Sequence, residues 1–143
     1  MDRRIKQLFI GVVILLYQVA GLYAGEQKKA AVFLSDTIKP YYEAAQSLET
    51  ELKKNKINIK LVEIKNLDHS EFKLLCQDLV RQGYVYWVSI GPLAMSKIYD
   101  YHLPEVAGRV YSMVLAPEKM VNQGDTLCGV SLQIPVEKQV QEL

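Results

Sequence analysis

The sequence predicts an α/β fold, namely a doubly wound, mostly parallel open sheet of about five strands in the order 2-1-3-4-5, with helices on both faces. Short apolar runs alternate along the chain with longer segments in which apolar residues recur every three or four positions. Such alternation indicates right-handed βαβ crossovers, which place helices over a parallel sheet. The 143 residues suffice for one domain, and no internal repeat or linker marks a second.

The first half of the chain supplies two strands and two helices. Residues 30–34 are a continuous apolar run, as expected of a strand buried on both faces. A helix with one apolar face follows, starting near Pro40. Residues 59–64 are rich in β-branched side chains and predict a second strand with an edge-like position. Asp68 and Glu71 have the spacing of a capping pair and predict the start of the next helix.

The second half predicts three further strands. Residues 85–90, which include Trp87, are the most strand-like run and predict a central, buried strand. Gly91 and Pro92 end that strand and begin a short helix. Residues 110–115 and 128–132 predict the last two strands. Pro135 is expected to begin a final helix.

The N-terminal residues 1–24 have the layout of a signal peptide. Three basic residues precede an apolar stretch that continues to Ala24. The stretch lies at the lower length limit for crossing a bilayer, so cleavage after Ala24 or Gly21 is expected, with an uncleaved membrane anchor as the alternative. Residues 25–143 then form one α/β lobe in a periplasmic or other extracytoplasmic location.

Charge and cysteine content narrow the possible partners. Residues 25–143 contain 14 Lys and Arg against 15 Asp and Glu, a net charge of −1, with no basic stripe. This balance argues against nucleic acid, and against a membrane as a partner except through an uncleaved signal segment. Export would permit a disulfide between Cys76 and Cys128, but both positions also suit small buried thiols, which is the favoured interpretation.

The candidate ligand site is the crevice at the carboxyl ends of strands one and three, where the connections of this strand order diverge. Backbone N–H groups at the start of the following helix would attract an anionic group such as a carboxylate, and hydroxyl groups would add contacts. A plain strand-to-helix turn is the alternative interpretation. The ring of Tyr42 could cover an organic ligand, whereas Tyr41 fits the core. The candidate residues are Ser35, Asp36, Thr37, Tyr42, Gly91, Pro92, Leu93 and Ala94.

Enzyme chemistry finds little support in the sequence. Asp68, His69 and Ser70 are adjacent at a helix start and cannot converge as a catalytic triad. His69 and His102 have no metal-like spacing with the cysteines. No phosphate loop, dinucleotide fingerprint or nucleophile elbow is present. We therefore expect a protein that is not an enzyme and that holds neither a cofactor nor a metal.

The order of several segments resembles the ABC transporter substrate-binding proteins of periplasmic-binding type I fold, a group that includes tryptophan and tyrosine receptors. The resemblance covers most of the lobe and depends on order and spacing. Pro92 stands where the family has a hydroxyl residue, and Cys128 where it has threonine. The segments that carry it are residues 31–35, 40–45, 89–94, 128–132 and 137–139.

The resemblance implies the first lobe of an exported solute-binding protein of an ABC-type uptake system. Its ligand would be a small organic or amino-acid-like molecule, and its partners an ABC permease or another periplasmic protein. A homodimer is also compatible with a single lobe. The competing hypotheses are an accessory or sensory interaction domain without a transport role, and a truncated gene product.

Overall fold

The computed structural model describes residues 27–122, 124 and 126–132. The predicted signal segment, residues 1–24, and the helix predicted from Pro135 lie outside this part of the chain. Within the described residues, no helix has both the length and the apolar character needed to cross a membrane.

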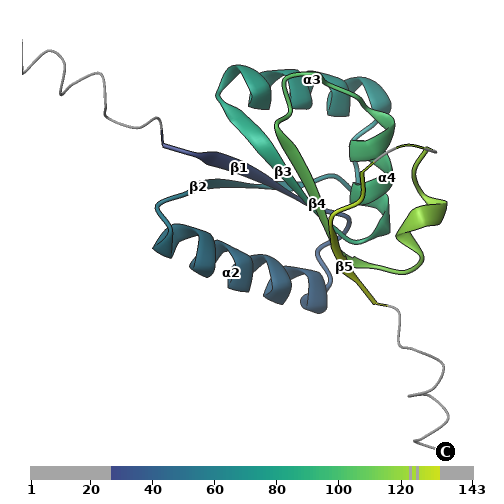
Figure 1. Cartoon of the computed structure of the whole chain (residues 1–143), viewed down its shortest axis with the longest axis horizontal. Helices are drawn as coiled ribbons and strands as arrows, with labels where there is room; N and C mark the ends of the chain where they lie inside the picture. Colours follow the sequence, from purple (N-terminus) through teal and green to yellow (C-terminus); the bar gives the residue numbers. More distant parts are fainter. Residues whose placement is uncertain (1–26, 123, 125, 133–143) are drawn as a thin grey trace, which may run out of the picture.

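The described residues form one five-stranded parallel sheet in the order β2-β1-β3-β4-β5, which confirms the predicted fold class (Figure 1). Helix α2 lies on one face, and α3 and α4 lie on the other. The strands are β1 (Lys29–Leu34), β2 (Asn58–Glu63), β3 (Tyr84–Ile90), β4 (Gly108–Val114) and β5 (Gly129–Ser131). The helices are α2 (Lys39–Lys54), α3 (His69–Arg81) and α4 (Pro92–Asp100), and a 3₁₀ turn, η1 (Pro117–Lys119), follows β4.

Local sequence signals explain where α3 begins and ends. The Asp68 carboxylate accepts a hydrogen bond from the Glu71 backbone N–H at 2.8 Å, and the Glu71 carboxylate accepts one from the Asp68 N–H at 2.9 Å. This reciprocal pair satisfies donors that a helix start otherwise leaves unpaired, and it confirms the predicted capping role. Gly83 follows the helix with φ 85°, a conformation that glycine adopts without steric cost.

The face of the sheet beneath α3 and α4, here called the closed face, holds the larger core. Its centre is an aromatic cluster in which the Phe33 ring lies 5.3 Å from Trp87 and 6.0 Å from Phe72, between ring centroids. The Trp87 indole is fully buried and donates a hydrogen bond to the Tyr84 carbonyl at 2.8 Å. A buried indole N–H needs an acceptor, and the Tyr84 carbonyl provides it. Because its side chain is fully buried, Trp87 is a core residue, as predicted.

The described residues cover only half of the face beneath α2. A smaller core of Val32, Leu34, Ala45 and Ile90 lies where α2 packs on β1, β2 and β3. Strand register extends this face beyond α2, because Val110 pairs with Val88, and Val130 pairs with Ser112. Val110 is 41% exposed and Val130 is 68% exposed. We call this surface, formed by Tyr86, Val88, Val110 and Val130, the open half-face.

The two cysteines are free and differ in environment. Cys76 is fully buried in the closed-face core, as predicted. The expectation that Cys128 is a buried thiol is wrong, since Cys128 is exposed. The residue immediately precedes β5, an edge strand with no neighbour on its outer side among the described residues, so the local apolar pattern does not bring burial.

Candidate functional site

The turns after β1 and β3 meet at the carboxyl edge of the sheet, as the crevice prediction requires. The Ser35 N–H donates to the Ile90 carbonyl at 3.0 Å, and the Ser35 hydroxyl accepts from the Ala94 N–H at 2.8 Å. Ser35 and Ala94 are both buried. Ser35 therefore serves as an acceptor for the first turn of α4, a role that a ligand anion could otherwise fill.

Gly91 lies at the centre of this junction. Its φ is 89°, and a Cβ placed on it would lie 2.7 Å from the Ser35 hydroxyl oxygen and 2.8 Å from the Tyr41 ring. Glycine is required here both by backbone conformation and by close approach. The close approach is made by Tyr41 of the chain itself, which packs against the α2-face core, whereas Tyr42 is exposed on α2.

Around this junction, apolar side chains remain in solvent. Ile38 is 46% exposed, Leu93 is 39% exposed and Leu115 is 61% exposed. They belong to the β1–α2 turn, the start of α4 and the position immediately after β4. We call the surface formed by Thr37, Ile38, Pro92, Leu93 and Leu115 the carboxyl rim. Ile38 and Leu115 were not among the predicted site residues. Ile38 is an apolar residue between polar turn residues, which is a usable signal, whereas Leu115 was predicted to end a strand.

The backbone near the end of β4 has two non-glycine residues in the left-handed region. Met113 has φ 57° and Ala116 has φ 46°, and neither is a glycine. Such conformations cost about 1–3 kcal/mol each and persist only where the surrounding structure enforces them. They concentrate at ligand clamps and similar sites, so the carboxyl end of β4 has a feature typical of functional surfaces.

Asp36 is engaged rather than free. Its carboxylate accepts a 2.7 Å contact from the Lys65 ammonium and a 2.7 Å hydrogen bond from the Thr37 N–H. The hydrogen bond from Lys65, helped by that from Thr37, holds the pKa of the Asp36 carboxyl below its ordinary value. Asp36 is therefore ionised at neutral pH, and its ion pair with Lys65 links the turn after β1 to the turn after β2. Thr37 is then the polar side chain of the carboxyl rim beside α2.

A hollow of about 550 Å³ lies beside part of the carboxyl rim. Pro92 and Leu93 line it together with Ser96 and Asp100 of α4 and residues 119–122. The other predicted site residues do not line this hollow. The structure thus brings Ser35, Gly91 and Ala94 together in a buried junction and presents Pro92 and Leu93 at the surface.

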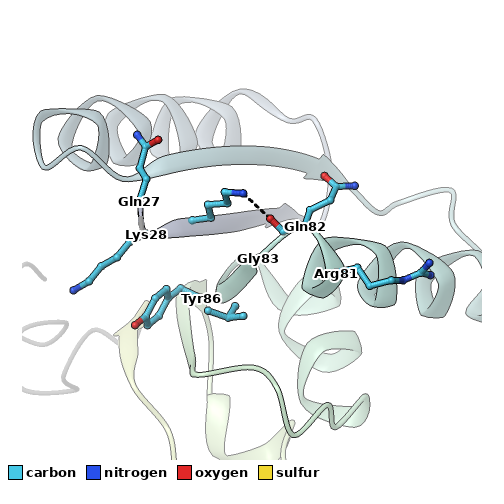
Figure 2. A pocket seen from close by; sticks show the side chains of 8 residues that line it. Gln27, Lys28, Arg81, Gln82, Gly83 and Tyr86 are labelled. Carbon is cyan, nitrogen blue, oxygen red and sulfur yellow. Dashed lines mark hydrogen bonds between the residues drawn. The ribbon is translucent and has the colours of Figure 1, made fainter. Parts of the chain in front are cut away.

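A second hollow, of about 440 Å³, lies at the opposite end of the sheet (Figure 2). Lys28 and Arg81 line it but point in different directions rather than toward one point. Lys29 is already engaged within the lining of the hollow, because its ammonium donates to the carbonyl of Gln82, another lining residue, at 2.7 Å. Cations that diverge cannot clamp an anion together, so this hollow lacks the geometry of an anion-binding clamp.

Two groups that could take part in nucleophilic chemistry, Asp68 and Cys76, have structural positions in the described part of the chain. Within residues 27–122, 124 and 126–132, no three His, Cys, Asp or Glu side chains are grouped so that they could hold a metal ion. Asp68 caps α3, while its neighbour His69 is exposed. Burial raises the pKa of the Cys76 thiol to about 12, which suppresses the reactive thiolate.

Comparison of the chain with protein-family models, with curated proteins and with solved structures finds no match in any of the three.

Proposed function

We propose that this chain is an exported solute-binding domain that holds a small organic or amino-acid-like ligand on the carboxyl rim. The observation that carries the proposal is the exposure of Ile38, Leu93 and Leu115 around the junction of β1 and β3. Open parallel sheets bind ligands at this edge, where connections diverge. Apolar surface there supplies the hydrophobic part of a small-molecule site.

Polar groups for orienting the ligand accompany these side chains. Thr37 is exposed and contributes a hydroxyl that both donates and accepts. In the first turn of α4, the Ala94 N–H is taken by Ser35, so the Leu93 N–H is the donor at the rim. A ligand carboxylate at this position would also be favoured by the α4 dipole. The rim is one-sided, so a second protein surface would strengthen the site.

The proposal is tested by calorimetric titration of the full chain with a panel of amino acids and short organic acids. We expect saturable binding of at least one member, and loss of that binding in Leu93→Asp. The matched control is Leu74→Asp, since Leu74 is exposed on α3 and outside the carboxyl rim. The proposal fails if no panel member binds, or if Leu93→Asp and Leu74→Asp bind equally well.

A second candidate is an interaction domain that needs no small ligand. The observation in its favour is that Ser35 and Tyr41 already fill the space beside Gly91, as a cradled ligand would. Under this alternative, the panel gives no binding, and Leu93→Asp weakens association with a protein partner recovered from the same cell compartment. The two candidates therefore give opposite results in the titration.

A further inference from the structure

The open half-face is an unusual surface for a parallel sheet. Parallel sheets are almost always covered on both faces, since their strands are apolar on both sides. α3 and α4 cover the closed face, whereas α2 packs on β1, β2 and β3. Among the described residues no helix lies over β4 and β5 on the α2 side. Something outside the described part of the chain must cover Val110 and Val130 if this sheet follows the rule.

An apolar hollow of about 260 Å³ adjoins this surface and shows where additional side chains fit. Leu52 and Ile57 form its wall beside α2, and Tyr86 and Val88 form its floor on β3. Tyr86 and Val88 also belong to the open half-face, so the hollow and the exposed valines make one continuous apolar surface. Such a surface suits the apolar side of an amphipathic helix.

The chain itself supplies a suitable segment immediately after β5. The Leu132 N–H donates to the Val114 carbonyl at 3.0 Å, so the chain still lies beside the end of β4 when the described part stops. Pro135 suits the first turn of a helix. Val136, Val140 and Leu143 follow at spacings of four and three, which places them on one helical face.

The length of this segment matches the surface. A helix over residues 135–143 would be about 14 Å long, at 1.5 Å per residue. The open half-face runs from the row of Ile90, Ser112 and Val130 to the row of Tyr86, four residues away along β3, or about 13 Å. A helix that starts at the carboxyl edge and returns antiparallel to β5 therefore places Val140 near the row of Val88 and Val110.

We propose that residues 133–143 fold back as a helix that packs Val136, Val140 and Leu143 onto the open half-face. This segment would complete the second helical layer and cover β4 and β5 in cis. The proposal is independent of ligand binding at the carboxyl rim, which lies at the edge of the sheet rather than on its face.

A crosslinking experiment on the full chain tests it. Val110→Cys and Val140→Cys are introduced together in a Cys128→Ser background, and a short bis-maleimide is added. Cys76 does not compete, because it is buried and its thiol pKa is raised to about 12. We expect an intramolecular crosslink, with about ten-fold more product than the control pair of Val110→Cys with Gln141→Cys, whose helical position faces away.

Each alternative outcome overturns the proposal. Crosslinks between two chains would assign the surface to a second copy of the protein. Equal yields from the two cysteine pairs would show that Val140 is not oriented toward Val110. Hydrogen exchange provides a readout that needs no new thiol. Val140→Asp should accelerate amide exchange in β4 and β5, whereas Gln141→Asp should leave it unchanged. Identical exchange in both variants would also contradict the proposal.

Discussion

The two faces of the sheet are built from similar strands but differ in how they are covered. Among the described residues, the closed face carries two helices and an aromatic cluster around Trp87, and its core side chains are buried. Among the described residues, the α2 face has one helix, a small core, and valines on β4 and β5 that no described residue covers. The difference teaches that strand composition alone does not decide burial, since both faces are apolar.

The largest expected contrast is in thiol reactivity. Cys76 lies in the closed face with its pKa raised to about 12 by burial, so almost none of this thiol is ionised at pH 8. Cys128 is exposed beside the edge strand. Mass spectrometry after brief treatment with a maleimide should show one label in the folded protein, at Cys128, and two labels after denaturation. Rapid labelling of Cys76 in the folded protein would show that the closed face opens easily.

Adjacent residues of β3 allow the two faces to be compared directly. Trp87→Ala empties the centre of the closed face and should lower the free energy of unfolding by about 3–5 kcal/mol. Tyr86 points to the open half-face, and Tyr86→Ala should cost at least about 2 kcal/mol less, because its ring is partly in solvent. Denaturant titrations measure both values. Equal costs would mean that the faces are equally packed.

A substitution at Gly91 tests how closely Tyr41 of α2 packs against the turn after β3. Gly91→Ala should lower the free energy of unfolding by about 2 kcal/mol or more, since it combines an unfavourable φ with contact against Tyr41 and Ser35. Gly124→Ala is the matched control, because Gly124 has φ 106° but no atom within 4 Å of the added Cβ. If the midpoint temperature of thermal unfolding falls equally in both variants, the cost at Gly91 comes from its backbone φ alone and not from contact with Tyr41 and Ser35.

The smallest effect is expected at the Asp36–Lys65 pair, which joins the turns after β1 and β2. The pKa of Asp36 is lowered in the folded protein, so its contribution is present above the ordinary value of 3.8 and is lost as pH falls through the lowered value. The melting temperature of Asp36→Asn should therefore lie slightly below that of the unchanged protein at neutral pH, and the gap should close in acid. A gap that persists at about pH 2 would exclude ionisation as its cause.

The sequence alone predicted the order of elements and the sheet topology well. Periodicity identifies α2 through Tyr41, Ala45 and Leu48, and the capping pair of Asp68 and Glu71 marks α3. These signals are local, since each depends on residues a few positions apart. The strand order followed from the alternation of elements, which constrains the crossovers.

The exposure of β5 and the details of the junction could not be predicted in the same way. Val130 and Cys128 have the composition of buried residues, but burial depends on a neighbour that the strand itself does not encode. The positive φ of Met113 and Ala116 is set by packing around the end of β4, where glycine would have been the expected signal. Ser35 was predicted to face a ligand, and only the fold reveals that its hydroxyl accepts from Ala94.

The most direct test of the carboxyl rim is amide mapping by nuclear magnetic resonance during titration with a ligand that the panel identifies. We expect the perturbed amides to belong to residues 36–38, 93–94 and 115–116, at the carboxyl ends of β1, β3 and β4. Perturbations confined to the amino ends of the strands around Lys28 and Gly83, with none at the rim, would contradict it.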